Sequence, residues 1–292
     1  MDKVCKGSTR RNHELIRYQF NLKDQTAVIS GAARGLGLAF AEALASAGCD
    51  IAVLDVVPEP SLALYELRSQ HNIKVKYYIV DITVRDQVVN AVSEIVQDFG
   101  RIDININAAG VVTDEPFLTT SDKNLQRTFA VNINGSFLVA QACANAMVER
   151  YKLQHGDAPA NEATTGSIVF IASIATYIAS TAQQISCYTA SKAAIKGLVK
   201  PVAMELTRYG IRVNSLSPGY TMTDMMKALQ SQQPGLVKQF GKETLFGRIG
   251  LPEEMKGAIL WLCSSKASGW YTGQDLLLDG GATSWKHPAV LT

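Results

Sequence analysis

Tyr188 and Lys192 stand four residues apart, at the start of an apolar-periodic run over 193–206 that indicates a helix. Residues at this spacing lie on one face of a helix, so the phenol and the ammonium can meet at one site. A free tyrosine, with a pKa of about 10, is a poor acid or base near neutrality, and a neighbouring cation lowers that pKa. The pair can then exchange a proton with an alcohol or alkoxide. The same spacing is common on helix surfaces without any catalytic role, so a catalytic assignment needs support from other motifs of the chain.

A glycine-rich loop follows the first apolar, β-branched segment, 26–30, and precedes an alanine- and leucine-rich segment, 38–47. Its glycines are Gly31, Gly35 and Gly37. This order predicts a strand, a tight loop and a helix. Such a loop brings backbone N–H groups close to a pyrophosphate, and the helix dipole favours the negative charge. Asp55 ends the next buried strand, 24 residues after Gly31, near the distance expected for an acid that binds an adenosine ribose.

Strand-like and helix-like segments alternate along the whole chain. The expected strands are 26–30, 50–55, 74–80, 102–107, 167–172, 212–216 and 275–278, and the expected helices are 38–47, 62–70, 85–99, 122–152, 188–206 and 252–263. Strands that are apolar on both faces and alternate with helices predict an α/β fold, a doubly wound parallel sheet with helices on both faces. Such sheets bind ligands at the carboxyl ends of their strands. Four polar residues fall at expected strand ends and therefore converge on one edge: Asp55, Asp81, Asn107 and Ser173.

Length and composition fit one large domain, because 292 residues that are 47% hydrophobic can bury a substantial core. We expect a tail over 1–21, a single domain over 22–292 and a substrate-loop segment at about 220–250. A polar stretch, 155–165, has the character of an insertion.

Charge and cysteine content exclude several classes of function. The chain has 28 basic and 26 acidic residues, a net charge of +2, and no basic patch of the kind that binds nucleic acid. Its five cysteines are widely spaced and odd in number, which indicates neither a metal site nor a disulfide framework. No signal peptide or run of about 20 apolar residues is evident. We therefore expect a cytoplasmic protein without a metal, nucleic-acid or membrane partner.

From about Leu22 to Gly281 the chain resembles the short-chain dehydrogenase/reductase family. The resemblance rests on several motifs that follow one another in the family's order: a nucleotide loop, an acid beside the adenine, a turn beside the cofactor, a catalytic tetrad and a segment that holds the nicotinamide amide. In this sequence they are Gly31-x-x-x-Gly35-x-Gly37, Asp81, Asn107-Ala108-Ala109-Gly110, the tetrad Asn132, Ser173, Tyr188 and Lys192, and Pro218-Gly219 with Thr223. The tail and the long loop before Ser167 resemble fungal-type polyol and ketose dehydrogenases of this family.

The resemblance implies a Rossmann-type fold and a role for each member of the tetrad. Tyr188 is the implied general acid in reduction, and Lys192 lowers its pKa and binds the nicotinamide ribose. Ser173 polarises the substrate oxygen, and Asn132 holds a water that links Lys192 to solvent. The implied cofactor contacts are Gly31, Arg34, Gly35, Leu36, Gly37, Asp55, Asp81, Ile82, Asn107, Ala108, Gly110, Tyr188, Lys192, Pro218, Gly219, Thr221 and Thr223.

The sequence departs from the family pattern at three positions. Ser30 stands where threonine is usual, and Ala108 replaces a frequent asparagine, so one hydrogen bond of that turn is absent. Pro201 lies within the helix that carries Tyr188, where proline removes a backbone bond and often kinks the helix.

Two residues bear on the choice between NAD(H) and NADP(H). Asp55 can accept hydrogen bonds from both adenosine ribose hydroxyls and would repel a 2′-phosphate, and Val56 and Val57 offer no base. Arg34 favours binding of the 2′-phosphate of NADP(H), because family members that use NADP often carry a basic residue at this position. We favour NAD(H), since a repulsive group sets specificity, and keep NADP(H) as the alternative.

The expected activity is hydride transfer between a nicotinamide cofactor and a secondary alcohol or ketone, with a polyol and ketose as the preferred substrate pair. Thr181, Gln183 and Gln184 would suit a polyhydroxylated molecule, whereas Tyr177, Met222, Met225 and Met226 would suit an apolar one. The alternative is a ketone or 3-oxoacyl reductase of fatty-acid or secondary metabolism. A third hypothesis, from a different class of function, is a non-catalytic protein that senses dinucleotides. The resemblance also implies a homo-oligomer, a tetramer or dimer.

Overall fold

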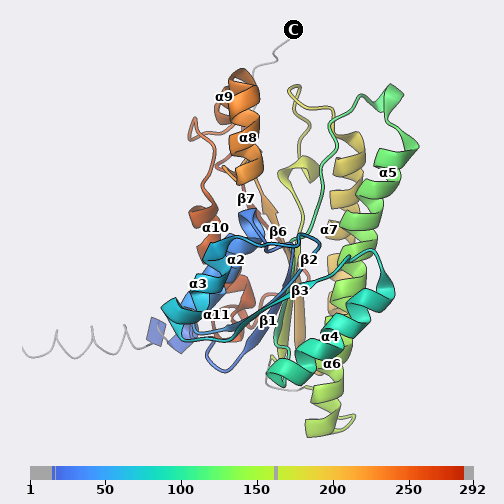
Figure 1. The fold of residues 1–292 in the computed structure, drawn as a ribbon, viewed down its shortest axis with the longest axis vertical. Helices are drawn as coiled ribbons and strands as arrows, with labels where there is room; N and C mark the ends of the chain where they lie inside the picture. The colour runs from blue at the N-terminus through green and yellow to red at the C-terminus, as the bar shows by residue number, and fades with distance from the viewer. Residues whose placement is uncertain (1–14, 17, 161–163, 286–292) are drawn as a thin grey trace, which may run out of the picture.

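The structure, a computed structural model, describes residues 15–16, 18–160 and 164–285. In this part of the chain, seven parallel strands form one sheet in the order β3-β2-β1-β4-β5-β6-β7 (Figure 1). The strands are β1 (Thr26–Ser30), β2 (Asp50–Asp55), β3 (Val75–Ile79), β4 (Ile104–Asn107), β5 (Gly166–Ile171), β6 (Ile211–Pro218) and β7 (Asp275–Leu278). This arrangement confirms the predicted doubly wound α/β fold. The strand order changes direction between β1 and β4, which opens a crevice at their carboxyl ends.

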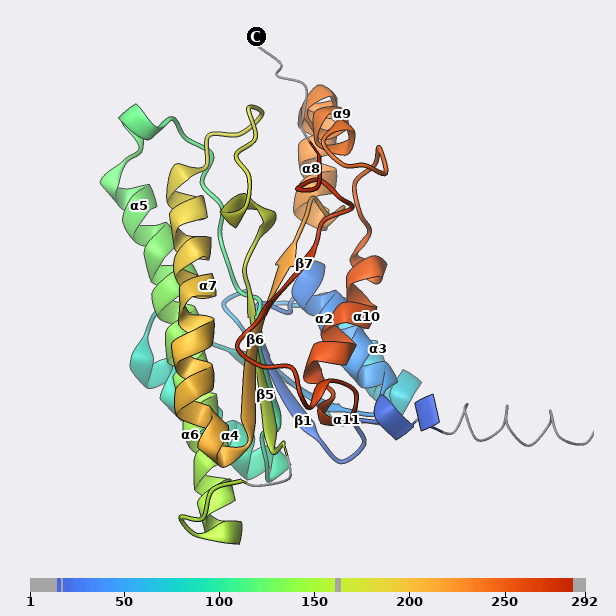
Figure 2. The ribbon, with the colours of Figure 1, turned by 180° about the vertical axis from the view of Figure 1, so that it is seen from behind.

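Helices cover both faces of the sheet (Figures 1 and 2). One face carries α2 (Gly35–Ser46), α3 (Leu62–His71) and α10 (Pro252–Cys263), and the other carries α4 (Arg85–Phe99), α6 (Ser136–His155) and α7 (Ser186–Leu206). Each layer buries one stripe of apolar side chains: Phe40, Leu44 and Ile259 on the first face, and Val92, Val139 and Ile195 on the second. The remaining helix on the first side is α11 (Ser265–Ser268).

The expected helical region over 122–152 is confirmed, but it is not one regular α-helix. It consists of α5 (Asp122–Phe129), a π-helical turn (Ala130–Gly135) and α6. The wide turn contains Asn132, whose buried side chain bonds to the backbone of Val111 in a neighbouring segment. Gly135 packs on Ile82, so closely that an added Cβ would lie 2.6 Å from the Ile82 Cδ1 atom. These tertiary contacts distort the helix where periodicity predicted continuity, and π-helical turns of this kind often occur at functional sites.

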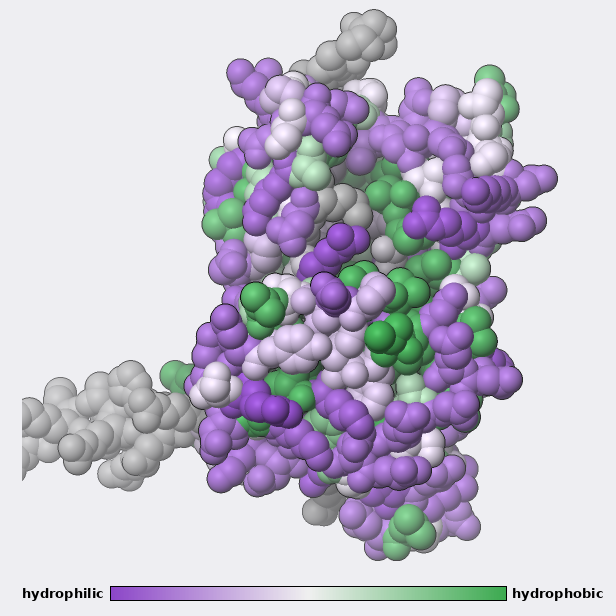
Figure 3. Space-filling model, in the orientation of Figure 1, coloured by the Kyte–Doolittle hydropathy of each residue, from purple (hydrophilic) through white to green (hydrophobic). Residues whose placement is uncertain are grey.

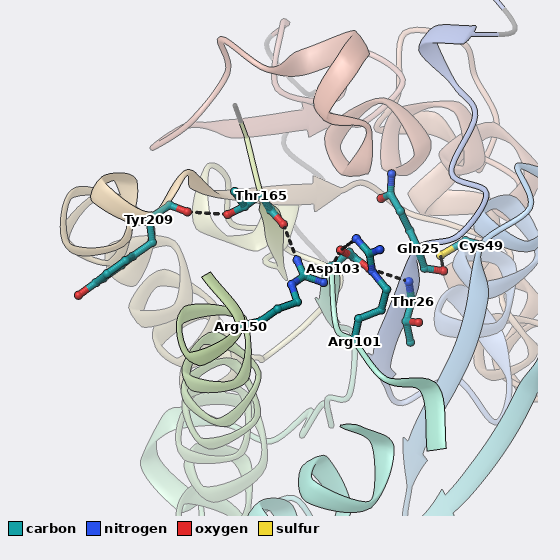
Figure 4. Close-up of polar contacts among 8 residues, drawn as sticks. All are labelled: Gln25, Thr26, Cys49, Arg101, Asp103, Arg150, Thr165 and Tyr209. Atoms are coloured by element: carbon teal, nitrogen blue, oxygen red, sulfur yellow. Dashed lines mark hydrogen bonds and ion pairs between the residues drawn. The ribbon is translucent and has the colours of Figure 1, made fainter. Parts of the chain in front are cut away.

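A charged cluster ties β1 to β4 at the amino end of the sheet (Figure 4). The buried carboxylate of Asp103 accepts hydrogen bonds from the Thr26 backbone N–H at 3.0 Å, from both guanidinium arms of Arg101 and from Arg150 at 2.8 Å. Arg150 also donates to the Thr165 carbonyl, at the end of the polar 155–165 stretch. The stretch therefore lies at the amino end of the sheet, and residues 161–163 within it are outside the described residues. The cluster fixes the two central strands relative to each other.

The segment predicted as a substrate loop, 220–250, contains α8 (Asp224–Gln232) and α9 (Pro234–Lys242). Both stand beyond the carboxyl ends of the strands (Figure 1). A small separate core of Val237, Phe240 and Ile249 holds α9 in place, with Tyr220 and Met222 packed against it. The segment thus forms a wall above the sheet edge where the polar strand-end residues converge.

Candidate active site

A cleft of about 1260 Å³ lies at the carboxyl edge of the sheet, between α7 and the α8–α9 segment. Figure 3 shows the molecule hollowed in this region, with apolar side chains among those at its walls. The volume exceeds the roughly 300–1,000 Å³ of an ordinary small-molecule pocket. Ten of the predicted site residues line it: Leu36, Ala108, Gly110, Ser173, Tyr188, Lys192, Pro218, Gly219, Thr221 and Thr223.

Tyr188 and Lys192 lie in the first two turns of α7 and both line the cleft. The Lys192 Nζ atom is 5.8 Å from the centre of the Tyr188 ring and donates a hydrogen bond to the Ile171 carbonyl at 2.7 Å. Burial lowers the pKa of Lys192 to about 8. The helix continues through Pro201, and the catalytic turn precedes it. The spacing therefore brings the two groups to one site, as predicted.

The expected effect of Lys192 on Tyr188 is not found. Burial raises the pKa of the Tyr188 phenol, and a weaker contribution from the Ser173 hydroxyl lowers it. The physical reason is that Lys192 bonds to the Ile171 carbonyl and lies 5.8 Å from the centre of the Tyr188 ring, so burial has the larger effect on the pKa of the phenol. Tyr188 is thus held in its protonated form near neutrality, which suits a proton donor.

Ser173 and Asn132 complete the predicted tetrad in different ways. The Ser173 Oγ atom accepts a hydrogen bond from the Ala175 N–H at 3.1 Å, and its hydroxyl interacts with the Tyr188 phenol across the cleft. The Asn132 amide is fully engaged: it donates to the Val111 carbonyl and to Ser191 Oγ, and accepts from the Val111 N–H, all at 2.8–2.9 Å. Asn132 therefore fixes the 111 segment against α7, and its side chain does not line the cleft.

Gly110 leaves room where the tetrad converges. A Cβ at this position would lie 3.3 Å from Asn132 Oδ1 and 3.4 Å from Lys192 Nζ. These two polar atoms therefore share one small space beside the cleft, into which a side chain at position 110 would intrude. Any larger residue would press on both members of the tetrad.

The glycine loop forms a cradle at the start of α2. A Cβ on Gly37 would lie 2.1 Å from the Gly31 carbonyl oxygen, so helix and loop are in direct backbone contact. Gly35, with φ +64°, has no atom within 4 Å of its Cβ position and leaves the helix N-terminus open. The first amides of a helix have no partner within it, and they favour an anion. The cradle fits the pyrophosphate of a dinucleotide.

Asp55 faces this cradle from the end of β2. Its carboxylate accepts hydrogen bonds from the Ala33 N–H at 3.0 Å and the Val57 N–H at 3.2 Å. Arg34 is exposed on the loop beside it. Farther along the edge, Asp81 accepts from the N–H and the hydroxyl of Thr83 after β3, and Ile82 is buried. If a dinucleotide placed its pyrophosphate at the N-terminus of α2, its adenosine would lie beside these groups.

Asn107 is the predicted cofactor residue that points elsewhere. Its side chain is buried within the sheet and donates to Asn105 Oδ1 at 2.7 Å. Ser30, which stands where the family usually has threonine, still uses its hydroxyl in the adjoining turn. Its Oγ atom accepts a hydrogen bond from the Ala109 N–H at 3.5 Å.

The predicted substrate residues divide into two groups. Gln183, Gln184 and Met226 line the cleft, whereas Tyr177 turns away, bonds to Asp275 and stacks with Lys196. Thr181 is not among the lining residues, Met222 packs against the α9 core, and the side chain of Met225 lies outside the described residues. The sequence does not predict the lining residues of the segment after β4: Val111, Val112, Asp114, Phe117 and Leu118. Only their position just after the end of β4 could have indicated them.

Comparison with known proteins decides the family. A family model described as enoyl-(acyl carrier protein) reductase matches residues 31–283. The chain is 35% identical to the sorbose reductase of Schizosaccharomyces pombe, over 91% of this chain and 98% of that protein. The chain belongs to the short-chain dehydrogenase/reductase family.

Two further short-chain dehydrogenases show the same extent of likeness. The gluconate 5-dehydrogenase of Gluconobacter oxydans is 34% identical, over 90% of this chain and 96% of its own length. The crystal structure of a gluconate 5-dehydrogenase from Burkholderia cenocepacia, in complex with NADP and tartrate, superposes with a TM-score of 0.82 at 31% identity, over 93% of this chain and 100% of that one. This short-chain dehydrogenase is accordingly an NAD(P)-dependent oxidoreductase of secondary alcohols and ketones.

Within residues 15–16, 18–160 and 164–285, no helix is both long and apolar enough to cross a bilayer. No group of three His, Cys, Asp or Glu side chains in the same ranges is placed to hold a metal ion.

Proposed function

We propose that this enzyme interconverts a polyol and the corresponding ketose, with Tyr188 transferring the proton. The observation that carries the proposal is the convergence of Tyr188, Ser173 and Lys192 on a cleft large enough for a cofactor and a second molecule. Amide and hydroxyl groups of Gln183, Gln184 and Ser180 line the same cleft and can bind substrate hydroxyls. The similarity to a sorbose reductase and to gluconate dehydrogenases supports this substrate class.

In the direction of ketone reduction, Tyr188 is the general acid. The raised pKa of its phenol keeps the proton in place until negative charge develops on the substrate oxygen. The Ser173 hydroxyl, which lies beside the Tyr188 phenol, would turn its proton to the same oxygen and stabilise that charge. Lys192, positively charged below its pKa of about 8, offsets the negative charge that Tyr188 acquires on losing its proton. Asn132 positions the 111 segment and α7, on which these groups depend.

The glycine cradle and Asp55 would hold a dinucleotide, which supplies the hydride chemistry when bound. We propose NAD(H) as the preferred form, because the Asp55 carboxylate faces the cradle and would repel a 2′-phosphate. Two findings favour NADP(H) instead: the exposed Arg34 on the same loop, and the NADP complex of the similar Burkholderia enzyme. Replacement of Asp55 by serine tests which of the two cofactors the enzyme prefers.

A ketone reductase is the second candidate, favoured by the apolar mouth of the cleft. Phe117 and Leu118 line the cleft and are 79% and 92% exposed, and Ile178 and Met226 add further apolar surface. These side chains could cover an apolar ketone as readily as the carbon skeleton of a sugar.

A rate panel separates the two candidates. It measures nicotinamide absorbance with sugar alcohols and NAD or NADP, and with ketoses and simple ketones and the reduced cofactors. We expect turnover of polyols and ketoses; reduction of simple ketones alone would replace the proposal with the second candidate.

Tyr188→Phe tests the chemistry directly. This variant should bind cofactor normally and lose at least about a thousandfold in kcat, because the proton donor is gone. Tyr177→Phe is the matched control, since its hydroxyl bonds to Asp275 away from the cleft, and it should keep near-normal turnover. Retained activity in Tyr188→Phe would remove Tyr188 from the mechanism.

The compartment and the oligomeric state remain proposals from the family resemblance. A cytoplasmic dimer or tetramer is what we expect, and β7 supports it as a half-exposed edge strand that follows the fully exposed Trp270. Size-exclusion chromatography with light scattering measures the oligomeric state.

A further inference from the structure

A buried carboxylate lies directly behind the cleft wall. Glu243, at the end of α9, is 5% exposed. Its Oε1 atom accepts hydrogen bonds from Ser180 Oγ at 2.9 Å and Gln239 Nε2 at 3.4 Å, and its Oε2 atom accepts from the Tyr220 hydroxyl at 2.7 Å. Among the described residues, no basic side chain forms an ion pair with it. An acceptor-only group is thus held in the interior by neutral donors.

This arrangement fixes what the wall offers to a substrate. Ser180 and Tyr220 both line the cleft, and each hydroxyl has a single proton, which it donates to Glu243. Ser180 Oγ also accepts from the Ala182 N–H at 3.1 Å, so neither hydroxyl has a proton left for the cleft, and what remains to face it are oxygen lone pairs. The Tyr220 ring is held in this orientation by stacking on Phe240, with 4.4 Å between ring centres. The wall accepts hydrogen bonds and has a negative charge behind it.

The other charged groups of the cleft reinforce this character. Asp114 lines the cleft and uses one carboxylate oxygen to accept from the Gln184 N–H at 2.8 Å. Lys192 is the one basic residue among the described lining residues, and its Nζ donates to the Ile171 carbonyl beside the tetrad. A carboxylate on a substrate would meet two acidic groups and no free cation on the substrate side.

We propose that Glu243, through Ser180 and Tyr220, makes this enzyme select uncharged polyhydroxylated substrates over sugar acids with the same carbon skeleton. The inference rests on the proposed polyol and ketose activity and narrows it. A substrate hydroxyl can donate to the wall, whereas a carboxylate brings only acceptors and a like charge, and loses its hydration without compensation. Such a repulsive element is an effective source of specificity. Family membership does not decide this point, because the similar proteins include both a sorbose reductase and gluconate dehydrogenases.

L-Sorbose and 5-keto-D-gluconate are a matched pair of probes. They share the configuration of the chiral carbons and the position of the ketone, and differ at the far end, where one has CH2OH and the other a carboxylate. We would measure kcat/KM for each with saturating reduced cofactor. The wild-type enzyme should prefer L-sorbose by at least about tenfold, the size of effect that an unpaired or repelled polar group produces.

Glu243→Gln assigns the effect to the proposed residue. The amide is similar in size, is uncharged and can donate a hydrogen bond, so it frees a hydroxyl proton of Ser180 or Tyr220 to face the cleft. The ratio of the two kcat/KM values should shift at least about tenfold toward the keto acid. Glu253→Gln makes the same change of charge on the exposed start of α10 and should leave the ratio unaltered.

Each outcome bears on a different part of the reasoning. A wild-type enzyme that uses both probes equally, or prefers the keto acid, contradicts the inference and leaves the proposed function intact. Turnover of neither probe, with reduction of cyclohexanone, overturns both. If kcat/KM in Glu243→Gln falls equally for the two probes, Glu243 is only structural. The ratio of the two kcat/KM values in the wild-type enzyme tests the inference even if the Glu243→Gln variant fails to fold.

Discussion

Replacing Gly37 with alanine should damage both the fold and the cofactor site. The new Cβ would lie 2.1 Å from the Gly31 carbonyl oxygen, 2.8 Å from its carbon and 2.9 Å from Ala32 Cα. Ordinary contact begins at 3.4 Å, so α2 and the loop must separate by about 3.4 − 2.1 = 1.3 Å. All three atoms belong to the backbone and cannot rotate away. Overpacking of this kind costs about 1–3 kcal/mol, or roughly 2–10 °C in Tm for a domain of this size.

The assay is thermal unfolding combined with titration of the cofactor by nicotinamide fluorescence. The dissociation constant should rise at least about tenfold, because the amides that hold the pyrophosphate move by more than 1 Å. Gly257→Ala, on the exposed side of α10 with no atom within 4 Å, is the control. It should keep or slightly raise Tm, since alanine is the better helix former. An unchanged Tm and dissociation constant in Gly37→Ala would show that helix and loop are not in fixed contact.

Three further variants or profiles test other parts of the molecule. Asp55→Ser should shift the ratio of kcat/KM for NADH and NADPH by about a hundredfold toward NADPH, because it removes a charge repulsion of several kcal/mol and leaves Arg34 in place; an unaltered ratio would mean that Asp55 does not select the cofactor. Asp103→Ala should lower the free energy of unfolding by about 3–5 kcal/mol in a denaturant titration, because Arg101 and Arg150 lose their shared carboxylate. Activity at 25 °C should persist in that variant, since the cluster is at the far end of the sheet, and a lost activity without lost stability would contradict this. The pH profile of ketone reduction should fall as pH rises through about 8, where Lys192 loses its charge while Tyr188 stays protonated; a constant rate up to pH 10 would show that the Lys192 charge is not required.

Local pattern was sufficient to predict the sheet and most of the site. Each strand is a short apolar run, and each strand end is marked by a polar residue or glycine, so Asp55, Asp81 and Ser173 could be placed on one edge without any tertiary information. The spacing of Tyr188 and Lys192 is likewise a property of a single helix. These features depend on residues that are close together in the sequence, and the hydrophobic periodicity of a segment is enough to predict them.

Features that depend on distant segments could not be predicted in this way. The π-helical turn at Asn132 follows from its bonds to Val111, 21 residues away in the chain. The raised pKa of Tyr188 follows from burial, which the sequence does not reveal. The network of Glu243 joins Ser180 and Tyr220, which lie 63 and 23 residues away, and no motif marks it.

The position of β1 at the centre of the sheet has a consequence for biosynthesis. Ala27 of β1 pairs with Ile104 of β4, so 77 residues must be added to the growing chain before that edge of β1 can be covered. At about 5–20 residues per second, the edge waits for roughly 4–15 s after β1 is made. An unpaired apolar strand edge is a template for aggregation. The protein therefore depends most on chaperones while its amino-terminal half is being synthesised. Slow translation before residue 104 would prolong this period.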